Sequence, residues 1–243
     1  MNVSPILLAF LLARYSLALR ALPHEIIRMR KGAIILCGGK STRMGRDKAT
    51  LPFGSELMLQ RVVRLLSNSV DQDSMMVVAA ANQSLPALPA CVKVARDIYE
   101  FRGPLQGLAM GMHHMSDRFD AVYATACDVP LLVPAFVDRM FQSLADYDVS
   151  VPFDGQHHHS LAAVYRPRVL PQMQALLDSD RLRTRFLFNL VRTREVPVDD
   201  LRDVDPRLVT LQNLNRYEDY LAALAAVGLA APAETGESSR QTL

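Results

Sequence analysis

A glycine-rich, basic segment near the start of the chain has the residue types that bind a polyphosphate. The sequence LCGGKSTRMGRDK covers residues 36–48 and places Gly38 beside Gly39. Neither glycine carries a Cβ, so the backbone amides there can approach a ligand closely. Against the single carboxylate of Asp47, the segment carries four cationic side chains, Lys40, Arg43, Arg46 and Lys48. Such a segment can surround a triphosphate; the alternative is a basic surface loop.

Two common phosphate-binding motifs do not describe this segment. A Walker loop has the pattern GxxxxGK[ST], and Ile34 stands where its first glycine belongs. The dinucleotide fingerprint GxGxxG does not occur in the segment either. The pattern that remains is LxGGxxxRMGxDK. Five of its positions, Gly38, Gly39, Arg43, Gly45 and Lys48, would recur by chance in about one chain in several thousand.

Two carboxylates follow apolar runs further along the chain. Asp97 lies in ARDIYEFRGPLQGL, residues 95–108, where it can accept hydrogen bonds from a base or a sugar, or form a turn before the next helix. Asp128 follows the apolar run YATAC and precedes Pro130. A carboxylate at the carboxyl end of a strand can hold Mg²⁺ against phosphates. The alternative for Asp128 is an ordinary turn before a proline.

The histidines and cysteines favour no metal site. His157, His158 and His159 are consecutive, and neighbours on an extended chain point to opposite faces, so we expect a loop. The three cysteines, Cys37, Cys91 and Cys127, are widely spaced and form no CxxC pair. Neither a disulfide framework nor a zinc knuckle is indicated, and the default location is the reducing cytoplasm.

The apolar pattern predicts alternating strands and helices. Strands are expected over 33–37, 75–81, 92–95, 121–126, 148–152, 160–165 and near Val196; helices are expected over 57–66, 105–115, 134–145, 169–177, 184–191 and 217–226. Alternation of this kind indicates an α/β fold, with a Rossmann-like, mostly parallel sheet and helices on both faces. Ligands of such sheets bind at the carboxyl ends of the strands, where the motifs above would meet.

Length and composition limit the classes of protein. The 243 residues carry a net charge of +2, half are hydrophobic and 21% are charged, which excludes a disordered chain, a coiled coil and a generally basic nucleic-acid binder. We expect a single domain over 32–227 and a flexible polar tail over 228–243.

Residues 1–31 are expected to be an N-terminal extension. Their apolar run, 5–13, is too short to span a membrane, which takes about 20 residues. The arginines follow this run, so a secretory signal is not indicated. Two alternatives remain, a transit peptide or translation that begins at Met29.

The residues quoted above resemble a known family. Over about residues 32–224 the chain is similar to the nucleotidyltransferases of the nucleotide-diphospho-sugar transferase type, which share a modified Rossmann fold. It most closely resembles the molybdenum cofactor guanylyltransferases, whose signature is LAGGxSxRMGxDK; Cys37 replaces the usual alanine. A later stretch, TLQNLNRYEDY, is similar to the family's NxNTPED. It retains Asn213 and Asn215, with Arg216 and Tyr217 in place of threonine and proline.

The resemblance implies an activity and a set of site residues. The activity is Mg²⁺-dependent transfer of GMP from GTP to the phosphate of molybdopterin (Mo-molybdopterin), with release of pyrophosphate. The implied catalytic residues are Arg43, Lys48 and Asp128, with Asp128 as the metal ligand. The implied nucleotide-binding residues are Leu36, Cys37, Gly38, Gly39, Lys48, Asp97 and Asp128. Asn213 and Asn215 would bind the pterin side, or Asn215 would cap the last helix.

The resemblance also bears on specificity and partners. Relatives that use CTP usually have AAG at positions 37–39, so Gly39 and Asp47 favour GTP. The alternatives are a transferase that uses CTP or another acceptor, and a nucleotide-binding regulator without turnover. Expected partners are molybdenum-cofactor delivery proteins or acceptor apo-enzymes, with no nucleic acid or membrane. Two features of the family differ in this sequence. Ser160 follows the histidines, where the family often has proline. The family also often has an asparagine at the end of the second strand, where this chain has Ala79–Ala81 and Asn82 comes later.

Overall fold

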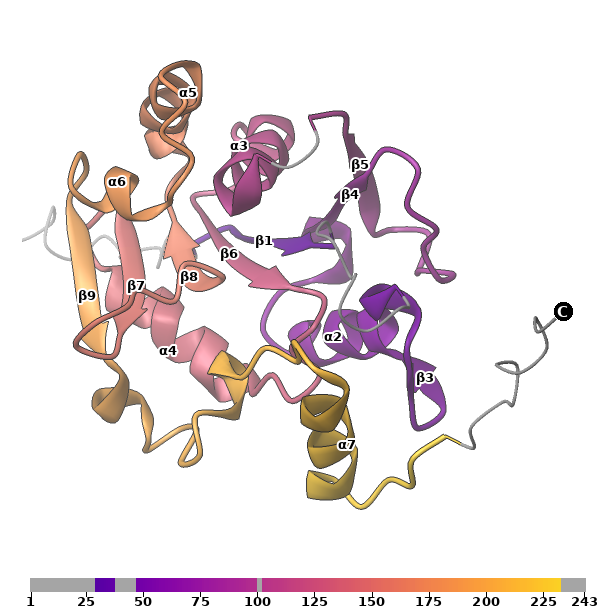
Figure 1. The fold of residues 1–243 in the computed structure, drawn as a ribbon. Helices are drawn as coiled ribbons and strands as arrows, with labels where there is room; N and C mark the ends of the chain where they lie inside the picture. Colours follow the sequence, from indigo (N-terminus) through magenta and orange to yellow (C-terminus); the bar gives the residue numbers. More distant parts are fainter. Residues whose placement is uncertain (1–28, 38–46, 100–101, 233–243) are drawn as a thin grey trace, which may run out of the picture.

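The computed structural model describes residues 29–37, 47–99 and 102–232, and a mixed β-sheet forms its centre (Figure 1). Within these residues seven strands pair in the order β5-β4-β1-β6-β8-β7-β9. Their bounds are β1 (Lys31–Leu36), β4 (Met75–Ala80), β5 (Lys93–Asp97), β6 (Ala121–Ala126), β7 (Val149–Phe153), β8 (Ala162–Tyr165) and β9 (Thr193–Pro197). Within this seven-stranded sheet, only the pairs that involve β8 are antiparallel. The predicted mostly parallel sheet is confirmed.

The central strands are apolar because both of their faces are covered. Ala33, Ile34 and Ile35 of β1 are fully buried, and every residue of β6 is buried. Side chains alternate along a strand, so Ala33 and Ile35 join one apolar cluster while Ile34 joins the other. Continuous apolar runs are typical of parallel strands between two layers of helices.

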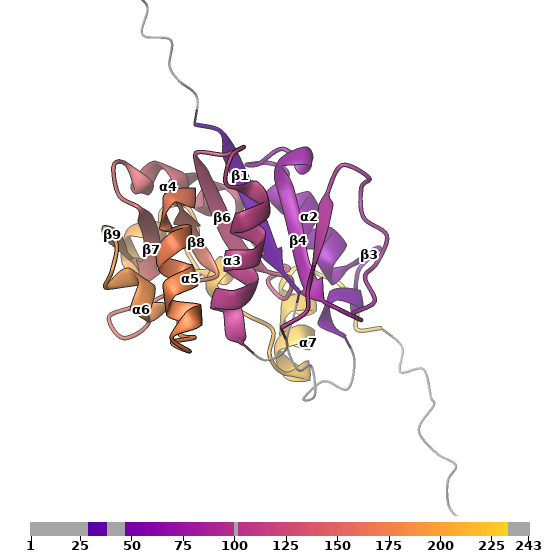
Figure 2. The same cartoon turned by 90° about the horizontal axis from the view of Figure 1, so that it is seen from above.

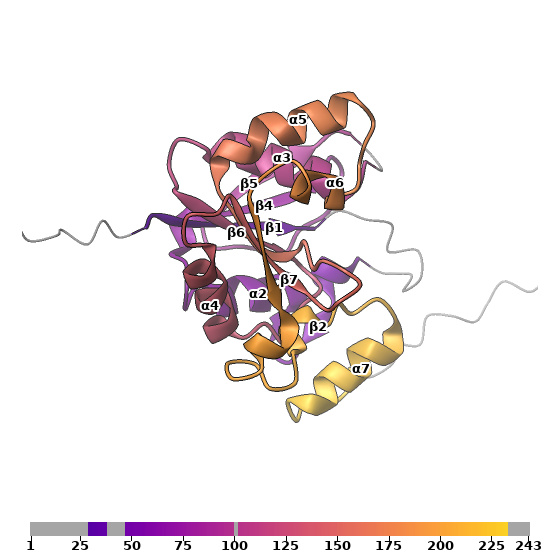
Figure 3. The same cartoon turned by 90° about the vertical axis from the view of Figure 1, so that its left-hand side faces the viewer.

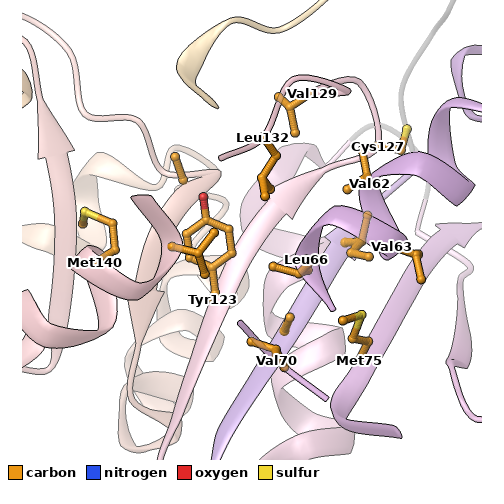
Figure 4. Close-up of a cluster of buried hydrophobic side chains, with 14 of the residues drawn as sticks. Val62, Val63, Leu66, Val70, Met75, Tyr123, Cys127, Val129, Leu132 and Met140 are labelled. Carbon is orange, nitrogen blue, oxygen red and sulfur yellow. The ribbon is translucent and has the colours of Figure 1, made fainter. Parts of the chain in front are cut away.

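Helices cover both faces of the sheet, as predicted (Figure 3). One face carries α3 (Gly103–Met115), α5 (Leu170–Asp178) and α6 (Arg185–Phe188); the other carries α2 (Met58–Leu66) and α4 (Pro134–Leu144). Figure 4 shows the second face, where Val62 and Leu66 of α2 lie near Tyr123 of β6 in a buried cluster. This apolar layer holds β1 and β6 at the centre of the molecule.

Two glycines let α3 lie close to the sheet. A Cβ on Gly111 would come within 2.9 Å of Ile34, and a Cβ on Gly107 would come within 3.2 Å of Leu36. Gly103 begins the helix with a φ of +74°, a backbone conformation that favours glycine. Gly107 therefore serves the packing of α3 on β1.

One helix is shorter than its sequence pattern predicts. The prediction covered 184–191, but α6 ends at Phe188. The chain must turn there to enter β9, and Thr193 Oγ1 donates a hydrogen bond to the carbonyl of Phe188 over 3.0 Å. The end of α6 is thus fixed by the start of the next strand.

The last helix, α7 (Tyr217–Ala226), lies on the side to which the carboxyl end of β1 points (Figure 2). Its Tyr220 and Leu224 pack with Phe53 and Met58, beside the small sheet of β2 (Pro52–Phe53) and β3 (Glu56–Leu57). Short 3-10 turns complete the described chain: η2 (Lys48–Thr50), η3 (Gln72–Ser74), η4 (Pro167–Val169), η5 (Val198–Leu201) and η6 (Val209–Leu211). No helix in the described ranges has the length and apolar character needed to cross a membrane.

Candidate active site

The segments that follow β1 and β6 are held together at the carboxyl edge of the sheet. The amide of Cys127 donates to the carbonyl of Leu36 over 3.0 Å, and the amide of Cys37 donates to Val78 over 2.8 Å. The parallel ladder therefore continues one residue past each strand. It brings Asp128 to the edge from which the predicted phosphate-binding segment departs.

Lys48 and Asp128 form an ion pair at this edge. Lys48 Nζ lies 2.7 Å from Asp128 Oδ2, and the two side chains are only 17% and 11% exposed. Lys48 begins η2, whose first turn is capped by the Asp47 side chain through a 3.0 Å hydrogen bond from the Ala49 amide. A 3-10 turn on one side and a buried strand end on the other thus fix the positions of the two charges.

Both predicted asparagines join this ion pair. Asn213 Nδ2 donates to Asp128 Oδ1 over 2.7 Å, and Lys48 Nζ donates to Asn215 Oδ1 over 3.1 Å. Between them, the Leu214 amide donates to the Asp128 carbonyl over 3.0 Å. Residues from three distant parts of the sequence therefore meet in one polar cluster: Lys48, Asp128, Asn213 and Asn215.

The Asn215 side chain does not cap α7, which was the alternative left open by the sequence. Arg216 is the N-cap residue of that helix. The amides of Asn215 and Arg216 both donate to Asp219 Oδ2, over 3.1 and 2.9 Å. Asp219 therefore fixes the entry to α7 and leaves the Asn215 side chain to contact Lys48.

The other predicted catalytic and nucleotide-binding residues divide into three groups. Gly38, Gly39 and Arg43 lie outside the described residues, so their roles stay predictions. Leu36 packs its side chain in the apolar cluster under α3. Asp97 ends β5 and accepts a 2.9 Å hydrogen bond from the Tyr99 amide. Asp97 shares the carboxyl edge with Asp128 but lies three strands away from β6 in the sheet order.

Cys37 occupies the position where the resembled family usually has alanine. Its side chain is buried, and a hydrogen bond with the Cys127 thiol, together with burial, raises its pKa well above the usual range. The thiol is therefore neutral at physiological pH and adds no charge beside the phosphate-binding segment. All three cysteines of the chain are free thiols.

The histidines lie in the connection between β7 and β8, where His157 and His159 both contact Asp154 and His158 contacts Glu195. His158 Nε2 lies 2.7 Å from Glu195 Oε1, and its ring stacks on Phe153 with centroids 4.7 Å apart. His159 Nε2 lies 3.4 Å from Asp154, and burial lowers its pKa. Within the described ranges no three His, Cys, Asp or Glu side chains converge as a metal site.

A pocket of about 220 Å³ opens between this connection and the segment before α7. Among the residues that line it are His158, His159, Ser160, Thr210, Leu211 and Asn213. Because Asn213 also binds Asp128, the pocket adjoins the polar cluster. The sequence did not single out Thr210 or Leu211. The one sequence feature that could have identified them is their position just before the asparagine motif.

Solved structures share this fold. A molybdopterin-guanine dinucleotide biosynthesis protein A from Archaeoglobus fulgidus superposes with a TM-score of 0.67 at 17% identity, covering 81% of this chain and 98% of that chain. A nucleotidyl transferase from Methanothermobacter thermautotroptrophicus gives a TM-score of 0.62 at 20% identity, covering 82% and 97%. The fold is that of the nucleotidyltransferase class.

Sequence comparison narrows the class to a family. The family model described as "MobA-like NTP transferase domain" matches residues 33–194. A protein named molybdenum cofactor guanylyltransferase, from Desulfosudis oleivorans, is 33% identical over 196 residues, which cover 80% of this chain and 94% of the relative. The chain belongs to the MobA-like NTP transferase family.

Proposed function

We propose that this protein transfers GMP from GTP to the phosphate of Mo-molybdopterin and releases pyrophosphate. The observation that carries the proposal is the cluster of Lys48, Asp128, Asn213 and Asn215 at the carboxyl edge of the sheet. The relative from Desulfosudis oleivorans, named for guanylyltransfer in molybdenum cofactor synthesis, supports the same substrates.

The reaction needs little from the protein beyond charge and alignment. An oxygen of the acceptor phosphate attacks the α-phosphorus of GTP, and the bond from that phosphorus to the bridging oxygen breaks as pyrophosphate leaves. The attacking oxygen is already anionic, so no general base is required. Catalysis then comes from holding the two reactants in line and from neutralising the triphosphate charge. The Lys48 ammonium supplies positive charge within a largely buried site.

Asp128 is the residue that we propose for binding Mg²⁺. Magnesium is usually held by one or two carboxylates together with phosphate oxygens and waters, so a single buried carboxylate beside a phosphate-binding segment is a suitable donor set. Bound there, Mg²⁺ would neutralise charge on the phosphate oxygens. Both oxygens of Asp128 are engaged by Lys48 and Asn213. The Lys48 ammonium would be repelled by Mg²⁺ on this carboxylate and would then be free to leave Oδ2 and contact a phosphate.

The pocket beside Asn213 is our candidate for the acceptor side of the reaction. It adjoins Asp128 through the bond from Asn213, so a phosphate at its mouth would lie near the proposed metal ligand. The base and sugar of GTP would lie on the other side, along the edge that ends at Asp97. Gly38, Gly39 and Arg43 are proposed to contact the triphosphate.

A panel of nucleotides tests the proposal. Purified full-length protein is mixed with Mo-molybdopterin, Mg²⁺ and GTP, CTP, ATP or UTP in turn, and pyrophosphate is measured. We expect release with GTP that depends on the acceptor. Equal release with CTP would overturn the base assignment, and release without any acceptor would show hydrolysis instead of transfer.

A further inference from the structure

Gln83, a residue that the sequence analysis did not single out, connects the end of β4 to the segment containing Lys48. Gln83 Nε2 donates to Asp47 Oδ1 over 3.0 Å, and Gln83 Oε1 accepts a 3.3 Å hydrogen bond from the Ala80 amide. Ala80 is the last residue of β4. One half-buried amide therefore links the end of β4 to a residue 36 positions earlier in the sequence.

Asp47 transmits this contact to Lys48. The same Oδ1 atom that accepts from Gln83 also accepts from the Ala49 amide, and the Asp47 carbonyl accepts from Thr50 Oγ1 over 3.0 Å. Asp47 precedes Lys48 directly and holds the middle and the last residue of the single turn η2 that begins at Lys48. A displacement of the Asp47 carboxylate would shift the start of that turn and with it the Lys48 side chain.

The turn that carries Gln83 is itself fixed. The Gln83 amide donates to the Ala80 carbonyl over 3.1 Å. Arg96 of β5 donates through Nη1 to the carbonyls of Gln83 and Ala80, over 2.6 and 3.2 Å. The Gln83 amide group therefore extends from a turn that two neighbouring strands hold in place.

We propose that Gln83 is a positioning residue for Lys48, acting through Asp47. This inference rests on the proposed function, because it assigns Lys48 the role of contacting the triphosphate. A hydrogen bond to a carboxylate stabilises more than one between neutral groups, so losing it should displace Asp47 measurably. Substituting Gln83 should therefore lower activity through Lys48, and this effect should disappear in a variant that lacks Lys48.

Two substitutions separate the bond to Asp47 from the bond to β4. Gln83→Ala removes both, and we expect kcat/KM for GTP to fall about tenfold. Gln83→Glu retains the acceptor for the Ala80 amide but places a carboxylate against Asp47, so it should lose at least as much. A Glu variant with near-normal kcat/KM would show that Gln83 only holds the turn, and would overturn the inference.

Gln60 provides a matched control. Its Oε1 accepts from the amide of Leu57, three residues earlier, and its Nε2 donates to the Ala87 carbonyl over 2.8 Å. Gln60→Ala therefore removes a similar pair of bonds without touching Asp47. We expect a comparable loss of melting temperature in both alanine variants, and a loss of kcat/KM only in Gln83→Ala. Equal activities in the two variants would contradict the proposal.

A double-mutant cycle with Lys48→Ala gives the decisive comparison. If Gln83 acts through Lys48, adding Gln83→Ala to Lys48→Ala should change kcat/KM by less than about twofold. If the two substitutions instead lower kcat/KM independently, so that their fold-losses multiply in the double variant, the inference is refuted.

GTP binding by the same variants, measured by calorimetry, gives a second test. If the wild-type protein transfers nothing, the proposed function fails, and calorimetry still tests Gln83. If Gln83→Ala weakens GTP binding in the protein that has Lys48 but not in Lys48→Ala, the positioning role is supported. An equal loss of affinity in both backgrounds, or no loss in either, contradicts it.

Discussion

Lys48 is paired with Asp128 in this structure, and we expect it to contact the triphosphate instead during the proposed reaction. In the structure its ammonium is neutralised by Asp128. A triphosphate with its Mg²⁺ brings both a cation for Asp128 and anionic oxygens for Lys48. We therefore expect the ion pair to exchange partners when GTP binds. Each residue is then needed for a different part of the same complex.

Replacing Lys48 with alanine should lower transfer by on the order of a hundredfold or more, because charge developing on the phosphates loses stabilisation by the Lys48 ammonium. The measurement is steady-state pyrophosphate release at saturating acceptor. Lys31→Ala is the control, since Lys31 forms a similar 2.8 Å ion pair with Asp138 at the other end of β1. Near-normal turnover in Lys48→Ala would contradict the assigned role.

Asp128→Asn should affect magnesium specifically. An amide is a weaker Mg²⁺ ligand than a carboxylate, so the Mg²⁺ concentration for half-maximal rate should rise by about tenfold or more. The matched control is Asp138→Asn, which removes a carboxylate from an ion pair far from the site. An unchanged magnesium titration in Asp128→Asn would exclude Asp128 from the metal site.

At the scale of elements, the site depends on how firmly β1 and β6 are joined along their whole length. At their amino ends, the Arg30 guanidinium and amide both donate to the Asp120 carboxylate, over 2.8 and 2.9 Å. These hydrogen bonds from Arg30 lower the pKa of Asp120. The pair lies at the opposite end of the strands from Lys48, so it can be changed without touching the site.

Asp120→Asn should destabilise the protein in a pH-dependent way. A carboxylate with a lowered folded pKa stabilises the protein above its unfolded pKa of about 3.9, and this stabilisation is lost as the pH falls through the lowered value. The melting temperature of wild type should exceed that of Asp120→Asn at pH 7, and the gap should narrow as the pH falls below the unfolded pKa and close below the lowered folded pKa. Asp117→Asn, at an exposed position nearby, is the control substitution. A gap that stays constant with pH would contradict this account.

The sequence predicted the elements better than it predicted their contacts. Runs such as 121–126 can be recognised because a strand buried on both faces consists mostly of apolar residues; in this run Thr125 is a buried polar exception. The reversed direction of β8 could not be predicted, because it depends on the short connection after β7. The end of α6 at Phe188 was also missed, since a hydrogen bond from Thr193 in the next strand sets it.

Within the site, sequence patterns identified residues but did not predict their pairing. Lys48, Asp128, Asn213 and Asn215 all belong to recognisable motifs, yet their mutual bonds depend on how the chain returns to the sheet edge before α7. Gln83 was missed because it belongs to no motif. Its only signal is an amide a few residues after a predicted strand, near where the resembled family has an asparagine. That residues 32–227 form one domain stays a prediction.

At the scale of the whole molecule, the account predicts selective stabilisation by one nucleotide. A ligand that binds only the folded state stabilises it by about 2.7 kcal/mol at a hundredfold excess over its Kd. We expect GTP with Mg²⁺ to raise the melting temperature clearly more than CTP at the same concentration. Equal protection by the two nucleotides would show that the base preference is wrong, while leaving the fold and the cluster around Lys48 unaffected.

The central claim is that the α-phosphorus of GTP is attacked at the cluster of Lys48 and Asp128. Transfer of label from GTP carrying ³²P at either the α or the γ position to Mo-molybdopterin tests it most directly. We predict that α-label appears in the pterin product and γ-label in pyrophosphate, and that Lys48→Ala and Asp128→Asn reduce both together. Label from the γ position in the pterin product, or release of orthophosphate, would contradict the account.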